Sequence, residues 1–208
     1  MSAPAKRDAT ATRERILAAG IAEFSLHGYR GARIEKIAAR SAANIRMIYH
    51  YFGSKEALYL ACLERIYLDI RTAERGLKLA DKEPTEALEE LIDFTFDYLL
   101  EHPEFVRLIC TENLERGQHL KRSRAIPETT LPLLEAIRDV LRRGEQAGVF
   151  RPGSDPIQLY VSLLSLCFVH ASNRYTLSAM FQIDLTDPDW LAARRAHAKD
   201  VLTRYLGA

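Results

Sequence analysis

Apolar residues recur at every third or fourth position along most of the chain, which is the spacing of one buried face of an α-helix. Strict alternation of apolar and polar residues, the mark of a strand, is absent. Asn44 and Ser54 are good helix caps, and Gly28 and Gly53 are typical helix ends. The first part of the chain is therefore expected to form four helices, over residues 10–27, 34–40, 45–52 and 55–79.

The rest of the chain shows the same helical periodicity, interrupted by prolines that suit the first turn of a helix. Five more helices are expected, over residues 84–102, 103–114, 127–148, 155–181 and 188–206. Residues 117–124 are basic and irregular. The predicted fold class is all-α with about nine helices, comprising an N-terminal domain over residues 1–55 and a C-terminal domain over residues 56–208.

Composition narrows the class of protein. Hydrophobic residues make up 48% of the chain, which is ordinary for a folded globular protein. No apolar run approaches the roughly 20 residues needed to cross a bilayer, and residues 1–15 lack the apolar centre of a secretory signal. The three cysteines are far apart, which argues against a disulfide framework or a zinc site. A cytoplasmic protein without metal or cofactor is expected.

The charge is distributed unevenly between the two predicted domains. Residues 1–55 contain ten Lys and Arg against four Asp and Glu, a net charge of +6 within a total of +1. The remaining residues therefore carry −5. A basic segment on an acidic chain indicates that the N-terminal domain meets a polyanion, although solvated surface charge could also be uneven by chance.

The segment 44–55 interleaves cationic, aromatic and hydrogen-bonding side chains on a helix too short to form much core. With the second helix and the tight connection at 41–44, it predicts a helix-turn-helix whose third helix lies in the major groove of DNA. Arg46 suits a guanine edge, Met47 a thymine methyl group, and Tyr49 and His50 base edges or phosphates. Ile48, Tyr51 and Phe52 fall on the opposite side and are expected to pack inside the domain.

Two further cations stand where helices begin. Arg33 precedes the second helix and Lys55 opens the fourth, and free backbone N–H groups at such positions favour a phosphate. The full set of candidate DNA contacts is Arg33, Asn44, Arg46, Met47, Tyr49, His50 and Lys55.

The N-terminal quarter of the chain resembles the signature of TetR-family transcriptional regulators. The similarity rests on Phe24, on Gly28 and on the runs Ile48-Tyr49-His50-Tyr51-Phe52 and Ser54-Lys55-Glu56-Ala57-Leu58, all in register. The resemblance implies a homodimer in which each N-terminal domain reads half of a palindromic operator. It also implies a C-terminal domain whose small-molecule effector controls repression.

Several positions depart from the family pattern. Ala42 stands where the turn usually has Gly, and Ala43 replaces a larger apolar residue. Arg33 follows Ala32 where Thr or Ser often caps the second helix, and Glu23 occupies a position that is usually apolar. An Ala forced into the left-handed region costs about 1 kcal/mol, so a less stable domain or an altered turn is expected.

The helix expected at 155–181 carries apolar residues on every face, so it should be buried on every face. In a chain of this size one face is most simply covered by a second copy. The resemblance likewise assigns the last two helices to dimerisation, as a four-helix bundle about a two-fold axis. The alternative is a fully internal helix in a monomer.

Polar and aromatic residues on otherwise apolar helices are the candidates for lining an effector pocket. The candidates are Tyr67, Phe94, Tyr98, Phe105, Cys110, Asn113, His170 and Asn173. Each of them is also a reasonable core or interface residue.

Other classes of protein fit the sequence less well. An enzyme is not expected, because the chain has no Gly-rich phosphate loop and no nucleophile or zinc-protease motif. Glu115 and His119 have the i, i+4 spacing of metal ligands but no second pair nearby. A redox sensor would require an exposed, reactive Cys110. A DNA-bending protein would present apolar wedges to the minor groove rather than a helix suited to base edges.

Overall fold

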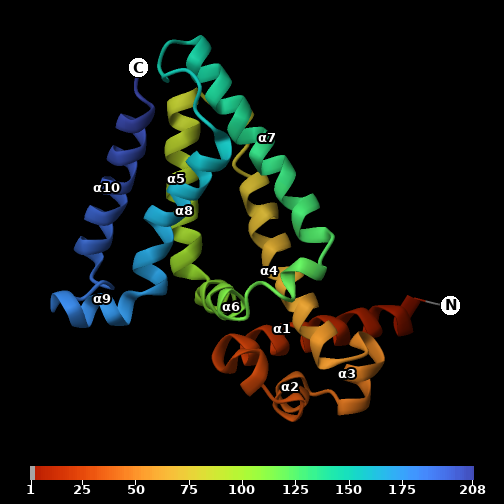
Figure 1. Cartoon of the computed structure of the whole chain (residues 1–208). Helices are drawn as coiled ribbons and strands as arrows, with labels where there is room; N and C mark the ends of the chain where they lie inside the picture. Colours follow the sequence, from red (N-terminus) through yellow and green to blue (C-terminus); the bar gives the residue numbers. More distant parts are fainter. Residues whose placement is uncertain (1–2) are drawn as a thin grey trace. The chain divides into compact units, whose positions relative to one another are not determined.

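The computed structural model describes residues 3–208, with side chains described from residue 9 onward. The described residues form ten α-helices and two short 3-10 helices, with no β-strand (Figure 1). The elements are α1 (Ala3–Gly31), α2 (Ile34–Ser41), α3 (Ile45–Phe52), α4 (Lys55–Arg75), η1 (Leu79–Asp81), α5 (Pro84–Glu101), α6 (Pro103–Leu114), η2 (Leu120–Arg122), α7 (Ala125–Gln146), α8 (Pro156–Ser172), α9 (Arg174–Phe181) and α10 (Pro188–Leu206). The all-α prediction is confirmed.

The chain forms two compact units. The head unit comprises Met1–Leu68 and Arg107–Ile126, and the body unit comprises Asp69–Val106 and Pro127–Ala208. The head unit thus contains α1, α2, α3 and most of α4, together with most of α6, the connection to α7 and the first residues of α7. The functional boundary expected between residues 55 and 56 stays a prediction.

In the head unit, α1 packs against α2, and α2 packs against α3. Ile16, Phe24 and Ile37 are fully buried in its core. Gly28 ends the regular part of α1 as expected, with φ 65°, and one more turn follows it. Gly20 lets α1 approach α4 closely, since a Cβ there would lie 2.9 Å from Sγ of Cys62.

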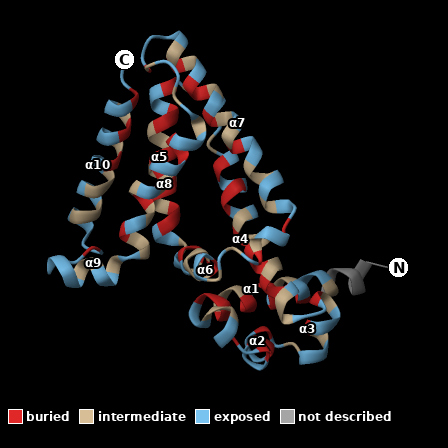
Figure 2. Ribbon diagram, viewed as in Figure 1, coloured by how far each residue is buried: buried red, intermediate tan, exposed pale blue. Residues whose placement is uncertain are grey.

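In the body unit, α5, α8 and α10 pack on one another (Figure 1). Buried residues follow one side of α5 and of α8 (Figure 2), and they include Ile92, Phe96 and Leu163. A Pro at the first turn begins α5, α8 and α10, and Asp side chains cap α8 and α10. These Pro and Asp residues explain why the starts of the three helices could be predicted from the sequence.

The single helix expected over residues 155–181 is two helices in the structure. α8 ends at Ser172, and α9 begins after Asn173, whose φ of −109° and ψ of 16° interrupt the helical backbone. The alternative of a fully internal helix in a monomer is wrong, because Ile157, Val161 and Val169 are 54%, 52% and 44% exposed in the single chain. α9 has no buried residue.

Candidate nucleic-acid interface and body cavity

The turn between α2 and α3 has the geometry of a helix-turn-helix despite its two alanines. Ala42 adopts the left-handed conformation with φ 51° and ψ 35°. The N–H of Ala43 donates to the carbonyl of Ala38 at 3.1 Å, which closes the end of α2. Asn44 then caps α3, since its side-chain oxygen accepts from the N–H of Met47 at 2.8 Å. The turn is therefore formed with alanine rather than glycine in the left-handed conformation.

The two sides of α3 are clearly different. Ile48 and Phe52 are buried in the head unit, whereas Arg46, Tyr49 and His50 are exposed. Met47 is half-buried, as is Tyr51. The structure thus brings Arg46, Tyr49 and His50 together on one solvent-facing surface of an eight-residue helix. These are the donors and rings from which base and phosphate contacts are built.

The start of α2 is capped from a distant position. Arg33 makes no side-chain cap, but its backbone N–H donates to Oε1 of Glu23 at 3.2 Å. Glu23 is buried, with only 4% of its surface exposed. The two departures from the family pattern therefore compensate each other, and the Arg33 side chain is left exposed on the surface.

Lys55 is half-exposed and contacts the end of α1 within the head unit. Its Nζ lies 5.1 Å from the centre of the Tyr29 ring and 3.5 Å from the carbonyl oxygen of Arg30. Burial lowers the pKa of the Lys55 ammonium group, against the opposing influence of Glu23 and Glu35. The predicted role of Lys55 in phosphate binding stays a prediction.

The connection between α6 and α7 is fastened within the head unit by Glu112. Oε1 of Glu112 accepts from the N–H groups of His119 and Leu120 at 2.8 and 3.0 Å, and Oε2 lies 2.9 Å from Nδ1 of His119. The His119 ring contacts the rings of Tyr29 and Tyr59 at 4.6 and 4.8 Å. His119 is therefore a structural partner of Glu112 rather than of Glu115.

Surface ion pairs hold the same connection. Arg30 donates to both carboxylate oxygens of Glu115, and Arg122 pairs with Glu56. The Arg30 contact is also what lowers the pKa of Glu115. Among the residues with described side chains, no cluster of His, Cys, Asp and Glu could hold a metal ion.

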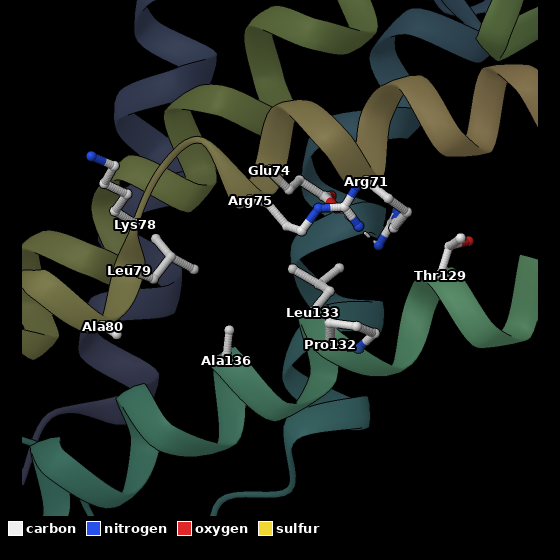
Figure 3. Close-up of a pocket in the computed structure, with 10 residues that line it drawn as sticks. All are labelled: Arg71, Glu74, Arg75, Lys78, Leu79, Ala80, Thr129, Pro132, Leu133 and Ala136. Carbon is white, nitrogen blue, oxygen red and sulfur yellow. Dashed lines mark ion pairs between the residues drawn. The ribbon is translucent and has the colours of Figure 1, made fainter.

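The body unit contains a cavity of about 210 Å³ between the end of α4, η1 and α7 (Figure 3). Charged side chains come from the α4 side, and apolar ones from α7 and η1. Its lining residues are Arg71, Glu74, Arg75, Lys78, Leu79, Ala80, Thr129, Pro132, Leu133 and Ala136. The connection between α4 and α5, which contains η1, is held by Arg143, whose Nη2 donates to the carbonyl of Leu79 at 2.8 Å.

Two charged residues in this cavity are almost fully buried. Arg71 and Glu74 are each 4% exposed, and Nη1 of Arg71 lies 3.1 Å from Oε2 of Glu74. Nη2 of Arg71 donates to the hydroxyl of Tyr160 at 2.7 Å. Burial raises the pKa of Glu74 to about 7, because desolvation outweighs the attraction of Arg71. A cavity with these buried charges can distinguish charged ligands from neutral ones.

The candidate effector residues lie elsewhere. In the body unit, the Tyr98 ring contacts Phe94 at 5.5 Å and Phe105 at 5.9 Å, forming an aromatic cluster. His170 is buried, with its ring 4.6 Å from that of Phe96, and burial lowers its pKa to about 4. Asn173 is exposed between α8 and α9.

In the head unit, Tyr67 is half-buried, and Asn113 is exposed with its Nδ2 donating to the carbonyl of Ile109. Cys110 is half-buried, and burial raises the pKa of its thiol, which is opposite to what a reactive thiolate needs. The effector roles of these residues stay predictions.

One feature of the sequence, the position of Glu74, indicates the cavity. Glu74 follows Ile66 and Ile70 at intervals of four residues, so it continues a buried apolar stripe on α4. A carboxylate on such a stripe requires a partner, and Arg71 one turn earlier supplies it.

A capped helix-turn-helix with an exposed polar surface, in a helical protein that also contains a charged cavity, defines the class of ligand-responsive DNA-binding regulators. Comparison with known families agrees. The model described as "Bacterial regulatory proteins, tetR family" matches residues 16–62, and "Tetracyclin repressor-like, C-terminal domain" matches residues 84–202. The chain belongs to the TetR family.

Individual relatives support the same assignment. The HTH-type transcriptional repressor NicS of Pseudomonas putida is 40% identical over 189 residues, covering 89% of each chain. The HTH-type transcriptional repressor SCO4008 of Streptomyces coelicolor is 35% identical over 169 residues, covering 79% of this chain and 82% of that protein. The transcriptional regulator FadR of Bacillus subtilis, solved with stearoyl-CoA, shares the fold alone: its TM-score is 0.70 at 18% identity, over 93% of this chain and 99% of that one.

The family fixes the broad activity. Members bind operator DNA and small-molecule effectors, typically as dimers, and the chain is a ligand-responsive transcriptional repressor rather than an enzyme. No helix in the described residues is long and apolar enough to span a membrane.

Proposed function

We propose that two copies of this chain bind a palindromic operator in the cytoplasm, each placing α3 in a major groove, and that an effector in the body unit weakens this binding. The single observation that carries the proposal is the exposed surface of α3. Its buried side fixes the helix in the head unit, so that Arg46, Tyr49 and His50 face solvent on a rigid support.

Dimerisation through α8 and α10 is supported by apolar residues that one chain leaves uncovered. Ile157, Val161 and Val169 are spaced along α8 at multiples of four, and Val201 and Tyr205 lie four apart on α10. Residues at i±4n form the ridges by which helices interdigitate. A second copy would cover these ridges by the same packing, which suits a two-fold axis.

Coupling between effector and operator is assigned to α4. This helix begins with Lys55 in the head unit and carries Arg71 and Glu74 in the body unit, so a single helix takes part in both. A ligand that stabilises one orientation of α4 changes the affinity of the head unit for the operator. Typical allosteric couplings are about 1–3 kcal/mol, or roughly 5- to 150-fold in affinity.

The proposal is tested by selecting bound sequences from random DNA and measuring the affinity of the recovered operator. Arg46→Ala should weaken operator binding about 5- to 150-fold, because a direct base contact is worth about 1–3 kcal/mol. The same substitution should reduce the affinity for unrelated DNA by a smaller factor. Arg138→Ala removes the same charge from an exposed site on α7 and should leave operator affinity unchanged. Equal affinities of both variants for the operator would refute the role of Arg46.

A further inference from the structure

We propose that the cavity between α4, η1 and α7 binds a small monocarboxylate, with the carboxylate group at Arg71 and the apolar part of the ligand against α7. This inference rests on the proposed function of the body unit as the sensor and names the chemical class of its effector.

Arg71 has hydrogen-bonding capacity that the described protein residues do not use. Nη2 bonds to Tyr160, but Nε and Nη1 have no hydrogen-bond acceptor among the described residues. Nη1 has only its ion-pair contact with Glu74. Buried donors without acceptors are costly, especially on a charged group. A carboxylate is the natural acceptor, because its two oxygens match the planar guanidinium.

The charges around the cavity favour an anion. Arg71, Arg75 and Lys78 are cationic, and Glu74 is the one acid among the lining residues. Because burial raises the pKa of Glu74 to about 7, this carboxyl group is only partly ionised near neutral pH. The lining therefore carries two cations, Arg75 and Lys78, beyond the ion pair of Arg71 and Glu74. A single negative charge on a ligand would improve the balance.

The apolar side of the cavity indicates the chemistry of the rest of the ligand. Pro132, Leu133 and Ala136 of α7 line it with apolar surface, and Leu79 of η1 adds to that surface beside Lys78 (Figure 3). Pockets for drug-sized ligands have volumes of roughly 300–1,000 Å³, and the cavity of about 210 Å³ is smaller. The space suits one ring or a short alkyl chain next to the carboxylate.

The test uses the full-length protein and three acid–amide pairs as probes: benzoate and benzamide, phenylacetate and phenylacetamide, hexanoate and hexanamide. Isothermal titration should show at least one acid binding more than tenfold more tightly than its amide. Arg71→Met should weaken that acid about 10- to 100-fold, the range of a charge-assisted hydrogen bond. Arg138→Met, on the exposed surface of α7, should not weaken it.

Arg71→Met leaves Glu74 without its partner and can impair folding. The double variant Arg71→Met, Glu74→Gln removes both buried charges, and it should remain folded by thermal melting while losing acid selectivity. The inference is overturned if no acid of the three binds, if acids and amides bind equally, or if the folded double variant keeps its selectivity.

Operator binding is measured separately, by fluorescence anisotropy with the selected DNA. Absence of specific DNA binding would count against the proposed function, whatever the probes do. Specific DNA binding without acid selectivity would count against the carboxylate site alone.

Discussion

At the scale of single residues, unusual side chains in the head unit are matched by contacts elsewhere in the chain. Arg33 lacks a capping side chain, and the buried carboxylate of Glu23 takes the backbone N–H instead. The sequence marks both positions as departures but does not link them, because they are ten residues apart and belong to different helices. Ala42 adopts a positive φ of 51°, which is sterically costly for alanine.

Ala42→Gly should stabilise the protein by about 1 kcal/mol, since glycine adopts positive φ without the steric cost that alanine incurs. The measurement is the free energy of unfolding from urea titration. Ala39→Gly provides a matched control, because Ala39 lies on the exposed side of α2 in regular helix. There the same change should destabilise by about 1 kcal/mol. A loss of stability in both variants would contradict the strain at Ala42.

His170 should make stability depend on pH. Burial lowers its folded pKa from the ordinary 6.5 to about 4, and Arg194 acts in the same direction. Between these values the unfolded chain binds a proton that the folded chain does not, so the free energy of unfolding should fall as pH drops from 6.5 toward 4.

His170→Phe keeps a ring against Phe96 and should remove about 1–3 kcal/mol of this decline. Urea titrations at several pH values measure it. His197→Phe, on the exposed surface of α10, should leave the decline intact. An unchanged pH profile in His170→Phe would show that other groups cause the decline.

At the scale of elements, helices were predictable wherever the chain marks their ends. Asn44, Ser54 and Asp155 cap the helices expected after them. The break at Asn173 was missed because apolar residues continue through it at helical spacing, and only the backbone reveals the interruption. The cavity was missed because charged residues normally face solvent. Burial of Arg71 and Glu74 depends on Leu133 and other residues of α7, far along the sequence.

The α6–α7 connection should depend on Glu112. Glu112→Ala removes the acceptor of two backbone N–H groups and should lower the free energy of unfolding by about 1–3 kcal/mol. Hydrogen exchange should accelerate at residues 119 and 120. Asn113→Ala, next to it on α6 and exposed, should change stability by less than about 0.5 kcal/mol. Unaltered exchange at residues 119 and 120 would mean that other contacts hold the connection.

At the scale of the whole molecule, the open ridge on α8 predicts an association that can be broken by one charge. Val161→Lys places an ammonium group in the proposed dimer interface and should convert dimers to folded monomers with weakened operator binding. Sedimentation equilibrium measures the mass, and circular dichroism checks the fold. Leu131→Lys, at an equally exposed site on α7, should remain dimeric. A dimeric Val161→Lys protein would place the interface elsewhere.

The head unit is assembled from two separate stretches of the chain, and this limits how such regulators can be recombined. A chimera joined at residue 62, where the N-terminal family match ends, would take Tyr29 and Tyr59 from one parent and His119 from the other. The capping carboxylate of Glu112 would also be supplied by the second parent. Exchange of DNA specificity between relatives should therefore succeed more often when residues 107–126 are transferred together with α3 and the rest of the N-terminal segment.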